Sequence, residues 1–507
     1  MINRIIIVGG GTAGWLVANH LGQAMKSRPE MKITLIESPT IPTIGVGEGT
    51  VPAIRQSLRK FGISESDFIQ RCNVTFKQSI KFVNWLDKNI HGENHYHHLF
   101  DVPVPYGIDL APFWLNQHKQ TAFADLVAAQ YQVVEAGLAP KAITSPEFGG
   151  LTSYAYHLDA RKFADFLHEH AVKHFGINHL YGDITDIDRD VDGYITALHS
   201  PQLGLQPCDF VIDCSGFNSV LLGEKMQVKF IDRSDHLLTD VALAVQIPTM
   251  EHSIVPPYTL ATAHQAGWIW DIALTNRRGV GLVYSSSHMD EEQACLKLNR
   301  YIGGGLENYP WRKINMRIGR REKFWHKNCV AIGLSQGFVE PLEATSILMT
   351  DFSADLLSKR FPENRAALEL LEQRFNQRLL HAWEQTFDFI KLHYCISDRS
   401  DSSFWLDNRD PATIPDTLLQ KIALWRHHPP AREDFFTKFE IFDFENYLYV
   451  LYGMKFNTPA PKLAPEYIKM AAAVQERVTL EAEVLKQKLI SHRALLEKIH
   501  KFGLQRL

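Results

Sequence analysis

The stretch "IIIVGGGTAGW", residues 5–15, constrains the fold of this chain more than any other. A run of β-favouring residues leads into a glycine-rich turn, and helix-forming residues follow it. Gly9, Gly11 and Gly14 satisfy the pattern G-x-G-x-x-G. Glycine at these places permits a tight turn, close backbone approach to a pyrophosphate, and close packing of helix on strand. The order strand, turn, helix therefore predicts a βαβ unit that binds a dinucleotide, in preference to a merely structural turn.

The residues after the turn support this prediction. Residues 32–36 read as a second strand ending at Glu37, whose carboxylate can accept hydrogen bonds from ribose hydroxyls. A later apolar stretch, "DFVIDCSGFNSVLL", has the form of a strand that ends at Asp213. A late strand followed by Asp-x-x-Gly is familiar from FAD-binding monooxygenases and their relatives. FAD is therefore favoured over NAD.

Periodicity along the chain predicts an α/β body followed by a helical C-terminal part. With its glycine turn and its Asp-x-x-Gly strand, this body resembles that of the flavin monooxygenases. We expect a long loop at 87–107, helices within 120–175, short strands from 177 to 335, helix from 349 to 392, and a last charged helix at 466–501. The expected domain division places an FAD-binding body with inserted substrate-side elements at 1–350. A mainly helical part at 351–507 would complete the substrate region.

The overall charge narrows the class of partner. The chain has 507 residues and a formal net charge of −4, with 53 basic and 57 acidic residues. Such a balance attracts neither nucleic acid nor anionic lipid, so a small molecule is the expected ligand. No apolar stretch is long enough to span a membrane. The six cysteines form no C-x-x-C pair, which favours reduced thiols and a cytoplasmic location.

Six further motifs converge on one family. They are "GGGTAGW" (9–15), "IGVGEGTVP" (44–52), "TFKQSIKF" (75–82), "GWIWDI" (267–272), "NCVAIG" (328–333) and "GFVEPLEATSI" (337–347). In this order, over nearly the whole chain, they resemble the flavin-dependent tryptophan halogenases. The paired-tryptophan and lysine motifs are specific to halogenases, whereas the glycine turn is shared with all flavin relatives.

The resemblance implies a halogenase that uses FADH2, O2 and chloride or bromide to halogenate tryptophan or another indole-like aromatic. A separate flavin reductase would supply the FADH2, and the enzyme could form a homodimer. By the same resemblance, the cofactor positions are Gly9, Gly11, Thr12, Ala13, Gly14, Glu37, Gly47, Glu48, Asp213 and Gly333.

Two residues match the family's catalytic positions. Lys77 matches the lysine that hydrogen-bonds hypohalous acid or forms a haloamine with it, which an ammonium or amine can do. Without the resemblance, Lys77 would read as a solvated surface lysine, and Lys81 would be an equal candidate. Glu343 matches the essential glutamate that takes the proton from the arenium intermediate or polarises the oxidant. Its alternative role is that of an acid in the first turn of a helix beginning near Pro341.

At two other motifs this sequence differs from the usual family pattern. Trp268 and Trp270 alternate along a strand, so they share a face, and the resemblance implies that they separate flavin from substrate. The family motif usually continues to Ile-Pro, but Ala273 stands here. Thr345 and Ser346 match the positions whose backbone N–H groups hold the halide, and most relatives have glycine at the second. If that backbone required positive φ, serine would be costly there.

Two alternatives stay open. A flavin monooxygenase that inserts oxygen would lack a use for the tryptophan pair, and a non-catalytic FAD-binding relative is kept open by Ala273 and Ser346. The histidine-rich stretch "HGENHYHH" offers His91, His95 and His98 at helical spacing, yet Gly92 indicates a loop. We therefore expect no metal site there.

Overall fold

The computed structural model describes residues 1–41, 47–437 and 440–505, with backbone alone for Gly47 and Glu48. The chain forms two compact units, each built from three segments. Unit 1 comprises 1–73, 158–233 and 317–383; unit 2 comprises 74–157, 234–316 and 384–507. This interleaved division differs from the expected boundary at residue 350, because that position lies inside a helix of unit 1, α10 (Thr345–Lys359).

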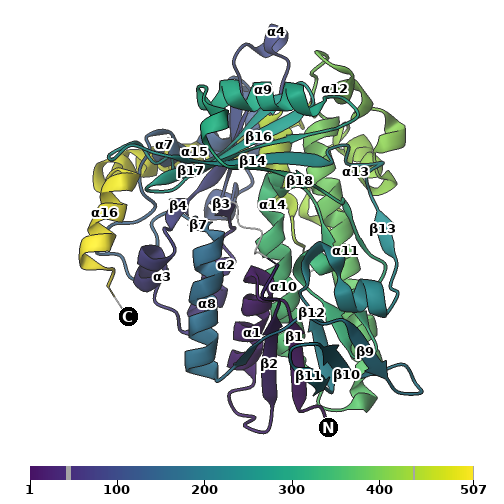
Figure 1. Cartoon of the computed structure of the whole chain (residues 1–507). Coiled ribbons are helices and arrows are strands. Elements are labelled where there is room, and N and C mark those ends of the chain that lie inside the picture. Colours follow the sequence, from purple (N-terminus) through teal and green to yellow (C-terminus); the bar gives the residue numbers. More distant parts are fainter. Residues whose placement is uncertain (42–46, 438–439, 506–507) are drawn as a thin grey trace. The chain divides into compact units, whose positions relative to one another are not determined.

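Unit 1 is organised around a mainly parallel six-stranded sheet, visible in Figure 1. The strand order is β20 (Trp325–His326), β21 (Cys329–Ala331), β12 (Phe210–Asp213), β1 (Arg4–Val8), β2 (Lys32–Glu37) and β8 (Asn178–Tyr181). The first and second strands of the chain pair in parallel, with α1 (Thr12–Ala24) as the crossover between them. The predicted βαβ opening is therefore confirmed.

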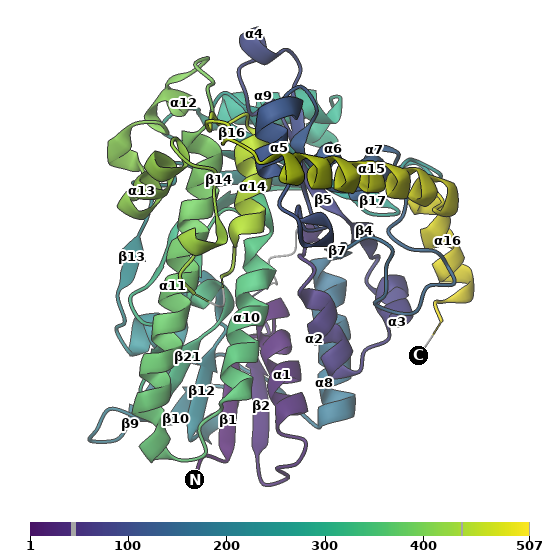
Figure 2. The same cartoon turned by 180° about the vertical axis from the view of Figure 1, so that it is seen from behind.

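Helices cover this sheet because their apolar residues face it and each other. The helix α1 is buried from Gly14 to Gly22 and packs with α8 (Ala160–Phe175) and α10, which lie beside it in Figure 2. Two shorter helices, α2 (Ile54–Phe61) and α3 (Glu65–Arg71), contact α1 and α8 respectively. The carboxyl ends of β1, β12 and β21 thus meet the glycine turn, the usual ligand edge of such a sheet.

Small antiparallel sheets complete unit 1. One contains β9 (Asp186–Arg189), β10 (Ile195–Ser200) and β11 (Gly204–Pro207). Another contains β13 (Phe230–Asp232), β19 (Gly319–Arg321) and β22 (Gly337–Phe338). The short strand β3 (Gly47–Gly49) also belongs to this unit's segments. The expected strand-rich region at 177–335 is thereby confirmed.

Unit 2 is organised around a seven-stranded sheet. Its order is β18 (Trp311–Asn315), β14 (Val241–Pro248), β17 (Arg277–Tyr284), β16 (Gly267–Ala273), β15 (Tyr258–His264), β5 (Ser79–Val83) and β6 (His95–Leu99). A separate antiparallel pair joins β4 (Thr75–Lys77) to β7 (Ala155–Asp159), whose last two residues belong to unit 1. The strand β6 lies inside the stretch expected to be a loop, and its alternation of buried apolar and histidine side chains explains the difference.

The helices of unit 2 fall into a short and a long set. The short ones are α4 (Lys88–His91), α5 (Ala111–Phe113), α6 (Phe123–Val127), α7 (Gln130–Glu135), α12 (Ser403–Asp407), α13 (Asp416–Trp425) and α14 (Phe444–Gly453). The longer ones are α9 (Glu291–Ile302), α15 (Pro465–Lys488) and α16 (His492–Phe502). The helix α11 (Leu368–Cys395) contributes residues to both units. The expected last helix is in fact two, separated at residues 489–491.

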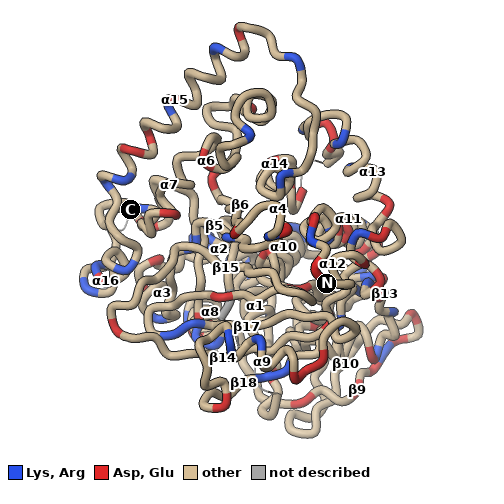
Figure 3. Tube along the Cα trace, turned by 90° about the horizontal axis from the view of Figure 1, so that it is seen from above, with Lys and Arg blue, Asp and Glu red and all other residues tan. Residues whose placement is uncertain are grey.

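Charges of both signs are interspersed along the trace in Figure 3. Among the described residues, no helix combines the length and the apolar character that crossing a membrane would require.

Candidate active site

The glycine turn in unit 1 has the close packing that its sequence predicts. Gly9 has φ +116°, and a Cβ there would lie 2.2 Å from the carbonyl oxygen of Cys214. A Cβ on Gly14 would lie 1.9 Å from the carbonyl oxygen of Gly9. Neither position tolerates a side chain, because backbone occupies the space on both sides. The turn is therefore pressed against the loop that follows β12.

The amino end of α1 offers free donors to a phosphate. Gly11 is the cap residue, and no side chain of the described chain caps this helix end. The first turn, which begins with Thr12 and Ala13, also contains no acidic residue. Uncapped N–H groups and the positive end of the helix dipole form a binding place for an anion such as a pyrophosphate.

Glu37 lies over the same turn. A Cβ built on Gly10 would come within 2.1 Å of the Glu37 carboxyl carbon, so a larger residue there would push the Glu37 side chain out of this position. The Glu37 Oε2 atom lies 3.0 Å from His179 Nε2 on β8. Glu37 is thus oriented by a histidine that sequence reasoning missed, since nothing in the sequence links residue 179 to the turn.

Asp213 ends β12, as the sequence predicts. It is fully buried, and its Oδ1 atom accepts hydrogen bonds from the Ser215 amide at 3.1 Å and hydroxyl at 2.5 Å. Its Oδ2 atom accepts from the amides of Leu221 and Leu222 at 3.0 and 2.8 Å. Both oxygens are therefore used by the local loop. Asp213 shapes the loop that meets Gly9, and its contact with the cofactor stays a prediction.

Gly333 brings a third segment to the turn. It has φ +79°, and a Cβ there would lie 2.6 Å from Ala13 Cβ. Together with Gly9 and Glu37, it fits the cradle that an FAD diphosphate and ribose require, because small residues and uncapped amides converge there. The side chains of Gly47 and Glu48, predicted to join this cradle, lie outside the described residues, as does the segment 42–46.

A small cavity of about 10 Å³ lies at the amino end of α10. Its lining includes Gly333, Gln336, Thr345 and Ser346. A volume of this order holds one water-sized particle. The Thr345 Oγ1 and Gln336 Nε2 atoms are buried and have no hydrogen-bond partner among the described residues. Two unpartnered polar atoms at an uncapped helix start suit a single bound anion.

Ser346 is better placed than the sequence suggested. It lies in the first turn of α10 and does not have positive φ. The left-handed residue is Ala344, with φ +56° and ψ +37°, which stands just before the helix. Serine at 346 is therefore compatible with the backbone of the predicted halide site.

Glu343 precedes that left-handed residue. It ends the short 3₁₀ turn η7 (Pro341–Glu343) and is 3% exposed. Because α10 begins only at Thr345, Glu343 is not an acid of that helix's first turn. The short helix η7 does begin at Pro341 and has Glu343 in its first turn, so the alternative role stays open beside proton transfer.

Lys77 in unit 2 is fully buried, unlike an ordinary surface lysine. It ends β4, opposite Ala155 on β7, and its Nζ atom lies 5.3 Å from the ring centre of Phe100. Burial, and next the charge of Lys77, holds the pKa of His157 well below its usual value. Lys81, the rival candidate, instead pairs with Glu135 at 2.6 Å. The structure therefore separates two lysines that the sequence could not.

The tryptophan pair lies in the middle of the unit 2 sheet. Trp268 and Trp270 are 1% and 5% exposed, with ring centres 6.2 Å apart. Gly281 on β17 stands opposite Trp270, and a Cβ there would lie 1.9 Å from the indole. This glycine, which sequence reasoning missed, makes room for the ring. The strand stays regularly paired through Ala273, so the loss of the family's proline leaves both indoles in place.

His91, His95 and His98, whose spacing would suit one helix face, do not lie on one. His91 pairs with Asp398 at 2.7 Å. His95 and His98 lie on β6, where an odd separation sends side chains to opposite faces. His98 Nε2 accepts a hydrogen bond from Asn446 Nδ2 at 3.1 Å on the face that contacts α14.

Comparison with known proteins agrees with this geometry. The sequence model of the tryptophan halogenase family matches residues 4–468. The tryptophan 7-halogenase RebH of Lentzea aerocolonigenes is 34% identical, with 91% of this chain and 92% of RebH covered. A tryptophan halogenase structure from Shewanella frigidimarina is 39% identical, with a TM-score of 0.97 over 100% of this chain and 99% of that one. Tar14, a tryptophan C-6 flavin-dependent halogenase of taromycin biosynthesis, is 33% identical, with a TM-score of 0.92 over 98% of this chain and 99% of its own. This chain therefore belongs to the tryptophan halogenase family of flavin-dependent enzymes.

Proposed function

We propose that the chain uses FADH2, O2 and chloride or bromide to halogenate tryptophan or another indole-like aromatic. The observation that carries this proposal is the cavity at the start of α10, whose lining includes two unpartnered polar groups, Thr345 Oγ1 and Gln336 Nε2. An enzyme that only inserts oxygen has no need of an anion-sized pocket beside its flavin cradle.

FAD would be held in unit 1 by the glycine turn, the amino end of α1, Glu37 and Gly333. Bound as FADH2, it supplies with O2 the oxidant that converts halide to hypohalous acid. The amino end of α10 holds the halide through its N–H groups and the Thr345 hydroxyl. Within the proposal, Ser346 contributes its backbone, and Gln336 is an additional donor.

The remaining residues direct the hypohalous acid. Lys77 hydrogen-bonds it or forms a haloamine, and its burial keeps water from competing for the same donors. Trp268 and Trp270 would separate the substrate from the bound flavin, so that the substrate is not oxygenated there. Glu343 accepts the proton released when the halogenated ring regains aromaticity.

A separate flavin reductase is proposed as the partner. The sequence contains a single G-x-G-x-x-G turn, at the amino end of α1 in unit 1. NADH alone should therefore leave the bound flavin oxidised. A location that keeps thiols reduced, such as the cytoplasm, suits the six free cysteines.

Product analysis tests this function. The chain, FAD, a flavin reductase, NADH and an indole panel would be incubated with and without bromide. Mass spectrometry should show brominated product only with bromide present. A product one oxygen heavier would favour the monooxygenase, and flavin binding without any product would favour the non-catalytic relative.

A further inference from the structure

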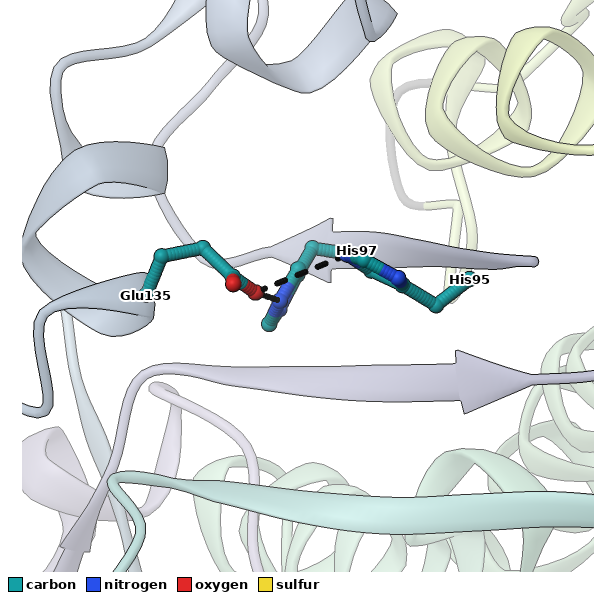
Figure 4. Close-up of side chains that lie close together, drawn as sticks. All are labelled: His95, His97 and Glu135. Carbon is teal, nitrogen blue, oxygen red and sulfur yellow. Dashed lines mark hydrogen bonds and ion pairs between the residues drawn. The ribbon is translucent and has the colours of Figure 1, made fainter. Parts of the chain in front are cut away.

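A group of side chains in unit 2 stands apart from the residues assigned above. His95 and His97 are two positions apart on β6, so both project from the same face. Glu135, the last residue of α7, meets them there, as Figure 4 shows. His97 Nε2 lies 2.6 Å and His95 Nε2 lies 3.7 Å from Glu135 Oε1. One potential ligand atom from each residue falls within 4.8 Å of the others.

The three side chains hold the protonation states that a metal requires. Burial lowers the pKa of His97 to about 4, and burial also lowers the pKa of His95. The hydrogen bond with His97, and next that with Lys81, lowers the pKa of Glu135 to about 2. At neutral pH both imidazoles are therefore neutral and the carboxylate is ionised. When a cation binds, the proton that His97 Nε2 donates to Glu135 would shift to Nδ1, where the Ser79 hydroxyl oxygen can accept it.

A hydrogen bond at its other ring nitrogen also orients His97. Its Nδ1 atom lies 2.9 Å from the hydroxyl oxygen of Ser79, on the neighbouring strand β5. This contact leaves Nε2 directed at Glu135. A fixed second nitrogen is the usual support of a metal-binding histidine. His97 is buried, while the side chains of His95 and Glu135 are 40% and 31% exposed, so a cation has access from solvent.

Lys81 offers another explanation for the position of Glu135, namely an ion pair. Its Nζ atom lies 2.6 Å from the same Glu135 oxygen, and the resulting ion pair could by itself join β5 to α7. The pair is partly exposed, and such pairs contribute little to stability. A lysine side chain can swing away from the carboxylate at that small cost, whereas His97 is held in place.

We propose that His95, His97 and Glu135 form a binding site for a divalent transition-metal ion of the zinc class. Two imidazoles and a carboxylate are ligands that Zn²⁺ prefers, and water would complete a tetrahedral set. The ion would displace the Lys81 ammonium from Glu135 and tie β6 to α7. None of His95, His97 and Glu135 has a role in the proposed halogenation. The proposal therefore does not depend on the halogenase function.

Zinc titration of the chelator-treated, tag-free chain tests the proposal. Isothermal calorimetry should show one saturable site per chain. Ser79→Ala should weaken it by about 10–100-fold, as removing an outer support does. Glu135→Gln and His95→Ala should weaken it more. Lys81→Met should tighten it, because it removes the competing ammonium. His199→Ala, in a surface histidine–aspartate pair at 2.8 Å with Asp188, should change nothing.

Co²⁺ loading gives a second readout, since a tetrahedral nitrogen and oxygen site absorbs visible light far more strongly than the hydrated ion. Circular dichroism of each variant would show whether it folds. The proposal is overturned if the wild-type chain has no saturable zinc site, even if Lys81→Met acquires one. It is equally overturned if folded Glu135→Gln and His95→Ala variants bind zinc as tightly as the wild type.

Discussion

Gln336 and Thr345 line the same small cavity, and each contributes a buried polar atom with no hydrogen-bond partner among the described residues. Gln336 Oε1 is held at 3.2 Å by the hydroxyl of Ser353, which donates to it. The same hydroxyl also donates to the Met349 carbonyl oxygen at 2.6 Å, and in this orientation of the amide the Gln336 nitrogen is the unpartnered end. Buried polar groups are nearly always satisfied, so a ligand or water is expected here.

Halide affinity should therefore depend on these two groups. Gln336→Leu and Thr345→Val should each raise the bromide KM roughly tenfold or more, because a hydrogen bond to an ion contributes about 1.5–3 kcal/mol. The measurement is the bromide dependence of brominated indole formation. Ser358→Ala, on the same helix with its hydroxyl on Asp355 O, is the matched control. An unchanged bromide KM in both cavity variants would place the halide elsewhere.

Ala344 should be a strained position. Its φ of +56° and ψ of +37° are left-handed, a conformation that costs a non-glycine residue about 1–2 kcal/mol. Ala344→Gly should therefore raise the unfolding midpoint in denaturant. Ala354→Gly, inside α10, should lower the midpoint instead, since glycine weakens a helix interior by about 1 kcal/mol. A lower midpoint for Ala344→Gly would show that no strain is relieved.

FAD affinity should depend on the Glu37 carboxylate. Glu37→Gln should weaken FAD binding about tenfold or more, because charge-assisted hydrogen bonds to the ribose are lost. Riboflavin, which lacks the adenosine ribose, should bind both forms alike. Quenching of flavin fluorescence measures both affinities. Glu30→Gln, at an acid paired with Arg28 on the surface, is the control. Equal losses for riboflavin and FAD would argue against the ribose contact.

Trp270 should control coupling of oxygen use to product. Trp270→Ala should lower the ratio of brominated product to O2 consumed severalfold, while Trp270→Phe should restore much of it. Gly281→Ala should act like Trp270→Ala, because its Cβ would occupy the space of the indole. Trp311→Phe, on edge strand β18, is the control. If Trp270→Ala formed as much brominated product per O2 consumed as the wild type, Trp268 and Trp270 would serve only to pack the sheet.

Glu343→Gln should slow halogenation by about 10²–10⁴-fold, the usual contribution of a proton-transferring residue. Oxidation of the reduced flavin should continue at the wild-type rate, since that step needs no proton acceptor at Glu343. Stopped-flow absorbance follows the flavin, and chromatography follows the product. Parallel loss of both rates would instead indicate a structural role.

The sequence predicted what local backbone rules determine. The turn at Gly9, Gly11 and Gly14 needs a strand before it and a helix after it, and both were found. The sequence did not predict the tertiary contacts of the site residues. The His179 contact to Glu37 joins residues far apart in the chain, and the Gly281 gap beside Trp270 depends on the register of two paired strands. The hydrogen bonds that occupy Asp213 are local, but two of them come from the backbone amides of Leu221 and Leu222, which leave no signal in the sequence. The stretch 87–107 was expected to be a loop, but His95–Leu99 within it forms β6. Histidines at alternating positions make a strand look like a polar loop in the sequence.

The rate of indole bromination by Lys77→Met tests the central claim most directly. Lys77 is buried beside Phe100, and methionine keeps most of its volume while removing the amine. With a scavenger of free hypobromite present, we expect no brominated indole from Lys77→Met although oxygen consumption continues. Lys81→Met, which only breaks the ion pair with Glu135, should brominate at the wild-type rate. Bromination by folded Lys77→Met at the wild-type rate would contradict the account.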